Sequence, residues 1–495
     1  MNRTEGIVSL VRKWIETGAL APGSKAPSVR QMSRITGYSM STVHSAYGAL
    51  ESAGVFTARP RSGFYVEDLR GLIEQPSQAS LRASSDIASA ISIDALTHRL
   101  FASWNNNELQ HFGAIYPSND LFPASDIYRH FRRALRNLPS AEWEAHSAPA
   151  QGDHGMREAL TRRYVEHGVA LCPDDILLTG GGMAGLNLCL SVLAKPGDTV
   201  LVESPSMFPI FAALEHRGLR PVEISYSPIH GLDPDEFEYL ADKHSVRVCV
   251  LMPAHHFPTG VSTPAAAVER IVHIARRRGL PIIENGGYMD LQYGPNGPQT
   301  LKKFDEDGMV VQIGSFSNTL APGYGVGWLV PGRFSEGITQ MKFASNLLSG
   351  GFLQRAFADY MQAGVFDRHL RTLRGKLRAR MARGLRLVAE NFPAECKWAV
   401  PSGGFTCWIE GPTGFDSVAA SREAMTLGIG LPPGPVFSAN GSFRNFLSLN
   451  FSFPWNDYSE SRLKAIGELI RRHTPARSGT VVREPVAPAS RGRLS

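Results

Sequence analysis

One stretch of the sequence combines hydroxyl, amide and glycine residues at a spacing that could hold a small molecule. Residues 314–328 read Gly-Ser-Phe-Ser-Asn-Thr-Leu-Ala-Pro-Gly-Tyr-Gly-Val-Gly-Trp, with Ser315, Ser317 and Asn318 near the front. The amide nitrogen of Asn318 cannot attack an aldehyde, because its lone pair is delocalised into the carbonyl group. This stretch therefore offers hydrogen bonds but no amine nucleophile.

Basic side chains gather in a second place, the first 66 residues. This stretch carries eight Lys and Arg residues against three Glu residues, a net charge of +5, while the whole 495-residue chain carries +6. Positive charge concentrated in a small module is what binding to a nucleic-acid backbone requires. The basic residues are Arg3, Arg12, Lys13, Lys25, Arg30, Arg34, Arg59 and Arg61.

Helices must position these charges, and the pattern of apolar and capping residues predicts where they lie. Apolar residues recur at helical spacing between Ile7 and Ile15, which predicts a first helix that stops near Gly18. Ser28 fits the N-cap of a second short helix that ends at Gly37.

A third helix and a hairpin complete the predicted module. The helix is capped by Ser39 and ends at Gly54, and the runs 55–59 and 63–66 alternate like two strands. Three helices and a hairpin in this order predict a winged helix-turn-helix, whose third helix enters the major groove of DNA. The inner face of this third helix is Val43, Ala46, Tyr47 and Leu50.

Residues 18–66 resemble the DNA-binding domain of GntR-family regulators almost end to end. The matching pieces are a Pro-Gly turn, Pro-Ser-x-Arg, Ser-x-x-Thr-Val, Ala-Tyr-x-x-Leu and Arg-x-Gly-Phe. The resemblance implies that double-stranded DNA is the partner, although Met40 stands where many relatives have an arginine. The residues that it implies for DNA binding are Arg30, Ser39, Ser41, Thr42, His44, Tyr47, Arg59 and Arg61.

The rest of the chain has the sequence pattern of an α/β domain. Strand-like runs at 176–179, 199–202, 246–252, 281–284 and 310–313 alternate with helical segments, which predicts a mostly parallel sheet. A chain of this length, 43% apolar, can form two or three domains with substantial cores.

Composition changes predict the domain boundaries. We expect a winged helix at 1–68, a linker at 69–105 rich in Ser, Ala, Gln and charge, and the α/β domain at 106–475. The Pro, Ser and Arg content of 476–495 predicts a disordered basic tail.

Landmarks across about 110–473 resemble, in order, the fold-type I aminotransferases, which bind pyridoxal phosphate (PLP). They include QGDHGMREAL, LLTGGGMAGLNL, GDTVLVESPSMFP, PAHHFPTGVSTP, PIIENGGYMDLQY, the stretch around Asn318 and PSGGFTCWIEGP. A GntR-type DNA-binding domain fused to such a domain is the architecture of the MocR subfamily. This resemblance implies a homodimer and a large domain that senses a small molecule. The implied pocket residues are Gly181, Gly182, Met207, Asn285, Tyr288, Ser315, Ser317 and Asn318.

The chain departs from the aminotransferase pattern at the residues that do its chemistry. The resemblance implies that Asn318 replaces the Schiff-base lysine, Asn285 the acid that pairs with the pyridine nitrogen, and Gly325 an arginine that holds the phosphate. Met207 stands for the ring-stacking aromatic residue and Ser448 for the arginine that binds the substrate carboxylate. We therefore expect no catalytic residue and no enzyme activity.

Several classes of protein are excluded by what the sequence lacks. No apolar run approaches the ~18 residues that span a bilayer, and the N-terminus has no signal-peptide core, so we expect a cytoplasmic protein. Five scattered cysteines form no metal-binding pattern, and the adjacent His255 and His256 have no third ligand at metal spacing. We expect one of these histidines to line the pocket.

Three hypotheses remain open from the sequence. The first is a transcription regulator whose large domain dimerises and senses an effector other than PLP. The second is a PLP-binding sensor or aminotransferase that uses the cofactor without a covalent link or recruits another lysine. The third is a structural scaffold with no ligand, which differs from the first only in lacking the sensor.

Overall fold

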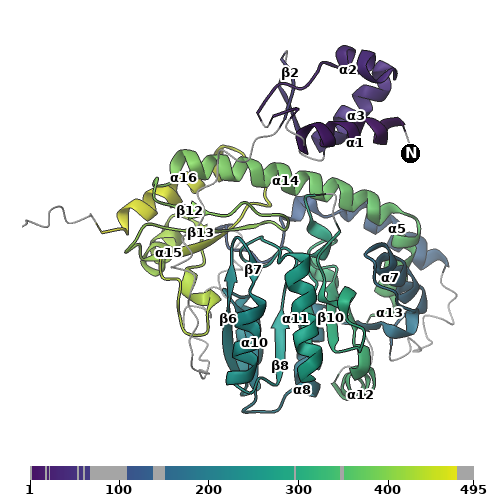
Figure 1. The fold of residues 1–495 in the computed structure, drawn as a ribbon, viewed down its shortest axis with the longest axis vertical. Coiled ribbons are helices and arrows are strands. Elements are labelled where there is room, and N and C mark those ends of the chain that lie inside the picture. Colours follow the sequence, from purple (N-terminus) through teal and green to yellow (C-terminus); the bar gives the residue numbers. More distant parts are fainter. Residues whose placement is uncertain are drawn as a thin grey trace, which may run out of the picture.

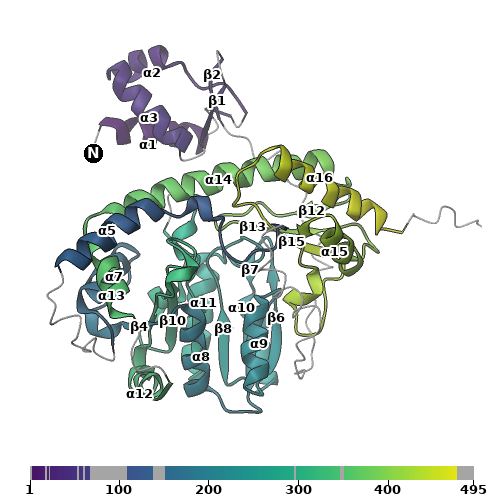
Figure 2. The ribbon, with the colours of Figure 1, turned by 180° about the vertical axis from the view of Figure 1, so that it is seen from behind.

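The computed structural model describes residues 3–16, 19–21, 23–52, 55–59, 62–66, 109–137, 151–294, 297–345 and 350–475. The predicted linker at 69–105 and tail at 476–495 lie outside these described residues, as does Arg61. A small N-terminal module and a large α/β domain are distinct in both views of the molecule (Figure 1, Figure 2).

The N-terminal module has the predicted order of elements: α1 (Arg3–Glu16), α2 (Val29–Thr36), α3 (Met40–Ser52), β1 (Phe56–Arg59) and β2 (Gly63–Val66). The strands pair as an antiparallel hairpin. Ser28 caps α2 by accepting a hydrogen bond of 3.3 Å from the backbone nitrogen of Gln31, and the Gln31 side chain caps Ser28 in return. The predicted inner face of α3, formed by Val43, Ala46, Tyr47 and Leu50, is completely buried.

The large domain is built on an eight-stranded sheet in the order β4-β11-β10-β9-β8-β5-β6-β7. Strands β10, β9, β8, β5 and β6 run parallel, while β11 and β7 are antiparallel to their neighbours. The mostly parallel sheet predicted from the sequence is therefore confirmed. The strands are β4 (Leu177–Thr179), β5 (Thr199–Ser204), β6 (Arg220–Ser227), β7 (Gly231–Leu232), β8 (Val248–Leu251), β9 (Ile282–Asn285), β10 (Val310–Ser315) and β11 (Gly327–Val330).

Helices cover both faces of this sheet, which is why its strands read as nearly continuous apolar runs. Along β5, Val200 and Val202 belong to the core on one face, and Leu201 belongs to the core on the other. The first core includes α8 (Gly182–Leu193) and α9 (Phe208–His216), with α12 (Ser335–Ser345) against α8; the second includes α10 (Pro234–Lys243) and α11 (Ala265–Arg278).

A smaller C-terminal unit packs beside the large sheet. Its antiparallel sheet has the order β12-β13-β15, and the 27-residue helix α14 runs along the upper edge of the domain (Figure 1). The remaining elements are α5 (Ala124–Asn137), α7 (His154–Glu166), α13 (Gly351–Gln362), α14 (Val365–Asn391), α15 (Ser417–Thr426), α16 (Asp457–Arg472), β3 (Gln110–His111), β12 (Lys397–Trp398), β13 (Thr406–Glu410), β14 (Ile429–Gly430) and β15 (Phe446–Asn450).

Within the part of the chain that the structure describes, no helix has both the length and the apolar character needed to cross a membrane.

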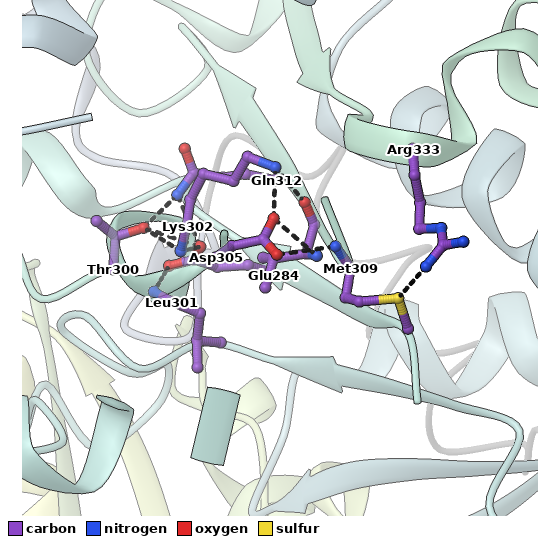
Figure 3. A network of polar contacts seen from close by, with 9 residues as sticks. Glu284, Thr300, Leu301, Lys302, Asp305, Met309, Gln312 and Arg333 are labelled. Atoms are coloured by element: carbon purple, nitrogen blue, oxygen red, sulfur yellow. Dashed lines mark hydrogen bonds and ion pairs between the residues drawn. The ribbon is translucent and has the colours of Figure 1, made fainter. Parts of the chain in front are cut away.

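A buried carboxylate ties β9 to the segment that follows it (Figure 3). Glu284 accepts hydrogen bonds from the Thr300 hydroxyl (2.8 Å), the Gln312 side chain (2.8 Å) and the backbone nitrogens of Leu301 and Lys302 (3.0 Å each). Burial raises the pKa of Glu284, whereas these hydrogen bonds lower it. Since Glu284 precedes Asn285 on β9, this network fixes the strand end that carries Asn285.

We expect Glu284→Leu to lower the free energy of unfolding by about 2–4 kcal/mol, because four buried donors would lose their acceptor. Urea unfolding of the intact chain measures this loss. The control is Glu269→Leu at an exposed position on α11, which we expect to change stability by less than about 0.5 kcal/mol. Equal effects of the two substitutions would contradict the role given to Glu284.

Candidate functional site

A cavity of about 200 Å³ opens beside the ends of β9 and β10 and the first turn of α8. The structure brings together around it all eight residues expected to form the pocket. They are Gly181, Gly182, Met207, Asn285, Tyr288, Ser315, Ser317 and Asn318.

Strand direction explains why residues so far apart in sequence meet here. The strands β9 and β10 are parallel neighbours, with Ile313 paired to Asn285, so their carboxyl ends reach the same edge of the sheet. Helix α8 starts at the same edge, directly after β4. In open α/β sheets this edge is where ligands bind.

Two asparagines hold one residue, Gly287, at the cavity wall. The backbone nitrogen of Gly287 donates to Asn285 Oδ1 (3.1 Å), and Asn318 Nδ2 donates to the carbonyl oxygen of Gly287 (3.2 Å). The amide nitrogen of Asn285 lies 3.6 Å from the sulfur of Met207. The bond from Asn318 therefore connects the loop after β10 to the loop after β9, while the bond to Asn285 lies within the loop after β9.

Two buried oxygen atoms at the cavity have no partner in the described structure. Asn318 Oδ1 and the Tyr288 hydroxyl make no hydrogen bond, although their residues are only 8% and 2% exposed. Burial raises the pKa of Tyr288 well above its ordinary value, so this hydroxyl stays protonated and can donate. Because unpaired buried polar atoms are costly, these oxygens favour a ligand with complementary groups.

The start of α8, which also lines the cavity, can hold an anion. Helix α8 begins at Gly182, and its N-cap Gly181 provides no side chain to satisfy the first backbone N–H groups. The hydroxyl groups of Ser315 and Ser317 lie 2.8 Å apart, and the Ser317 nitrogen donates to Ser315 Oγ.

Charge is missing from the cavity wall. Among the described residues that line it, none is Asp, Glu, Lys, Arg or His. The buried Lys342 on α12 lines a different cavity, together with Arg217.

Two positions that the resemblance assigned to arginines lie in different places. Gly325 lines the cavity wall with φ 57°, whereas Ser448 lies buried in β15.

The expectation that one of the adjacent histidines lines this cavity is wrong. His255 has φ 48°, so the segment is not extended, and its Nδ1 lies 3.1 Å from the Ser402 hydroxyl. His256 stacks on Tyr226 with ring centroids 3.7 Å apart, and its Nδ1 lies 3.0 Å from the Thr259 hydroxyl. No group of three or more His, Cys, Asp or Glu residues in the described chain could hold a metal ion.

Four of the residues expected to contact DNA are exposed on the N-terminal module. They are Arg30, Ser39, Ser41 and His44. The Ser39 hydroxyl accepts from the backbone nitrogen of Thr42 and lies 2.8 Å from the Ser41 and Thr42 hydroxyls, so it caps α3.

The assignment of Tyr47 to DNA contact is wrong. Its side chain is completely buried, its hydroxyl donates to the carbonyl oxygen of Pro27 at 2.7 Å, and burial raises its pKa to about 12. Tyr47 holds α3 against the start of α2. Arg59 lies on β1, but its side chain and the whole of Arg61 are outside the described residues.

Two further lining residues, Ile115 and Tyr116, were not predicted from the sequence. They lie between β3 and α5, in a segment without a recognisable motif. Their backbone reaches the cavity because the side chain of Asn450 donates to the carbonyl oxygens of Ala114 and Tyr116.

Family comparisons match the two bodies separately. A model of "Aminotransferase class I and II" matches residues 123–445, and a model of "Bacterial regulatory proteins, gntR family" matches residues 3–66.

Similar proteins span the whole chain. It is 30% identical over 473 residues to the HTH-type (helix-turn-helix) transcriptional regulator YjiR of Escherichia coli (strain K12), covering 95% of this chain and 99% of YjiR. Identity to the HTH-type transcriptional regulator YdcR of the same strain is 28%, with the same coverage. The solved kynurenine aminotransferase of Pyrococcus horikoshii has the same fold (TM-score 0.72, 23% identity), covering 81% of this chain and 98% of that chain.

The environment of His255 predicts a pH dependence of stability. Burial, with a smaller effect of the Arg374 charge, lowers the pKa of His255 to about 4, whereas an unfolded histidine titrates near about 6.5. The stability that the neutral ring provides is therefore complete above pH ~6.5 and is lost as the pH falls towards ~4.

We expect the unmodified protein to lose roughly 2 kcal/mol more unfolding free energy between pH 7 and pH 5 than the His255→Asn variant. Asparagine suits the test because it tolerates a positive φ. Urea titrations at both pH values give the difference, and equal losses would show that His255 is not the titrating group.

Proposed function

The chain belongs to the aminotransferase class I and II family and carries a gntR-family regulatory domain, and from this premise we propose a DNA-binding transcription regulator of the MocR type whose large domain forms no Schiff base with PLP. One observation supports the second part of the proposal: Asn318 lines the cavity at the position that the resemblance assigns to the Schiff-base lysine, and no lysine is among the described lining residues.

The residues of the cavity do not fit covalently held PLP. An aldehyde would meet the amide of Asn318, and a protonated pyridine nitrogen would meet Asn285 in place of a carboxylate. Asn285 Oδ1 is also already occupied by the backbone nitrogen of Gly287. We therefore derive no reaction through this cofactor and assign no catalytic residue.

A second candidate function is non-covalent sensing of a small molecule. It is favoured by the unpartnered Asn318 Oδ1 and Tyr288 hydroxyl and by the start of α8 with Ser315 and Ser317. This arrangement suits a small molecule that donates a hydrogen bond to Asn318 Oδ1 and carries an anionic group for the start of α8. PLP bound without a covalent link, with its phosphate at the start of α8, remains the alternative ligand.

We propose further that the large domain forms a homodimer. Curated relatives such as YjiR share almost the whole chain, and repeated operators are commonly read by two helix-turn-helix modules related by symmetry. Two copies of α3 would then contact two half-sites.

DNA binding should depend on the exposed residues of α2 and α3. We expect Arg30→Ala to weaken binding to every sequence and His44→Ala to relax preference at one base pair by about 1–3 kcal/mol. Binding is measured on duplexes selected from a random pool, and sedimentation of the complex should give two chains per duplex. The matched control is Tyr47→Phe, which removes only the buried hydroxyl and should leave base preference unchanged.

Deletion of residues 1–75 should abolish sequence-specific binding. A preference for the selected duplexes that survives the deletion would contradict the assignment of the N-terminal module.

Added PLP should give the unmodified protein no aldimine absorbance band and no borohydride-stable adduct. Asn318→Lys alone should restore little, because the lysine would face Asn285 and lose the hydrogen bond to Gly287. The pair Asn285→Asp and Asn318→Lys should bind PLP more tightly than the two single effects combined, since both act on one ligand.

Adding Gly325→Arg to this pair should help little, because a side chain at φ 57° costs about 1–2 kcal/mol. If the unmodified protein instead purifies with an aldimine band or transaminates an amino acid, the proposed loss of covalent PLP is wrong.

A further inference from the structure

Helix α14 carries a concentration of positive charge that neither the cavity nor the winged helix uses. Its sequence, VFDRHLRTLRGKLRARMARGLRLVAEN, has eight Lys and Arg residues and only two acidic residues, Asp367 and Glu390. The basic residues are Arg368, Arg371, Arg374, Lys376, Arg378, Arg380, Arg383 and Arg386.

The buried face of α14 fixes which of these charges reach solvent. Its buried residues, which include Phe366, Leu370, Leu373 and Leu377, recur every three or four positions and pack into the core. The side of the helix turned away from this stripe contains the exposed residues Arg368, Arg371, Thr372, Lys376 and Ala379. We call the exposed residues Arg368, Arg371 and Lys376 the basic crest.

Three other arginines of the helix, unlike those of the basic crest, form ion pairs with carboxylates. Arg374 donates to the Asp290 carbonyl oxygen at 2.6 Å, Arg383 pairs with Glu460 at 2.8 Å, and Arg380 pairs with Asp120. These pairs hold α14 onto the domain. No ion pair is recorded for the basic crest in the described part of the chain. Its charge is therefore available to an external anion.

The basic crest lies next to the DNA-reading module. Helix α3 contacts α14, and both views show α14 between the module and the large sheet (Figure 1, Figure 2). Beside this contact, a cavity of about 660 Å³ lies between α3 and α14. It is lined by Ala49 and Glu51 of α3 and by Arg371 and Lys376 of α14, among others. Glu51 is the one carboxylate among its described lining residues, so positive charge dominates this space.

We propose that the basic crest of α14 binds the phosphate backbone of the DNA duplex that the winged helix reads. This inference rests on the proposed function and adds a second contact surface, located on the large domain. Regularly spaced phosphates match cations spaced along an exposed helix, and such contacts give affinity without sequence preference. The large domain then takes part in DNA binding directly as well as by bringing two modules together.

The test compares the full-length protein with its Arg371→Ala, Lys376→Ala double variant on a random-sequence duplex of about 40 bp, roughly four helical turns. Affinity is measured at several salt concentrations. Losing two phosphate contacts per chain should lower the slope of log K against log salt by about 2 for each bound chain, or about 4 for the proposed dimer, and weaken binding roughly ten-fold or more near 0.1 M salt. Both side chains are exposed, so the unfolding midpoint should not change.

The control variant Arg162→Ala, Lys195→Ala removes the same charge from exposed positions of α7 and of the loop after α8. It should leave the salt slope unchanged. A slope for the crest variant that equals the control would overturn the proposal. Binding of inorganic phosphate is also titrated at constant ionic strength. A crest variant that loses phosphate binding but keeps its DNA affinity would overturn the proposal too, because the basic crest would then be a site for small anions.

Arg30→Ala, measured on the same duplex, separates this inference from the proposed function. If Arg30→Ala weakens binding and the crest variant does not, only the crest inference fails. If neither variant nor deletion of the N-terminal module changes DNA affinity, the proposed function itself fails.

Discussion

The parallel pairing of β9 with its neighbours β8 and β10 is the constraint on which the cavity of this protein depends. It brings the ends of three strands to one edge of the sheet and leaves the start of α8 beside them. Glu284 holds the end of β9 in place by accepting four hydrogen bonds, and the next residue, Asn285, lines the cavity. A cavity at this edge is thus a property of the fold and persists when the side chains around it change.

The side chains of the wall set its chemistry. The two positions that the resemblance assigns to an amine and an acid hold asparagines, and both asparagines hydrogen-bond to the same residue, Gly287. Asn318 therefore has a structural role, because its bond connects the loop after β10 to the loop after β9, whereas the bond of Asn285 lies within the loop after β9. The described wall carries no formal charge, so selectivity for a ligand must come from shape, from hydrogen bonds and from the first turn of α8.

Much of this organisation could be read from the sequence, because its signals are local. The cap at Ser28, the end of α2 at Gly37 and the buried strand runs lie within a few residues of where the pattern predicted them. The errors concern side-chain direction. Tyr47 matched a DNA-binding motif, but its helical position placed it in the core, and this packing constraint decided its role.

The backbone of His255 adopts the left-handed region, and the sequence alone did not indicate this conformation when one of the two histidines was expected to line the pocket. Ile115 and Tyr116 reach the cavity through tertiary contacts, among them the hydrogen bond from Asn450 to the carbonyl oxygen of Tyr116. Such contacts cannot be predicted from the local sequence pattern. The basic crest could have been found from the sequence by plotting α14 on a helical wheel. Its position beside α3 could not, because that depends on the arrangement of the two bodies.

Helix α14 also has a mechanical consequence. At 27 residues it is about 40 Å long, and its length spans the domain from the α13 side to the α16 side (Figure 2). A rigid rod of this length acts as a lever: a tilt of roughly 5° about one end displaces the other by about 3.5 Å, comparable to the rise of two residues along a helix. A slight repacking of the C-terminal unit would therefore reach the surface that faces α3 as a displacement of several ångströms.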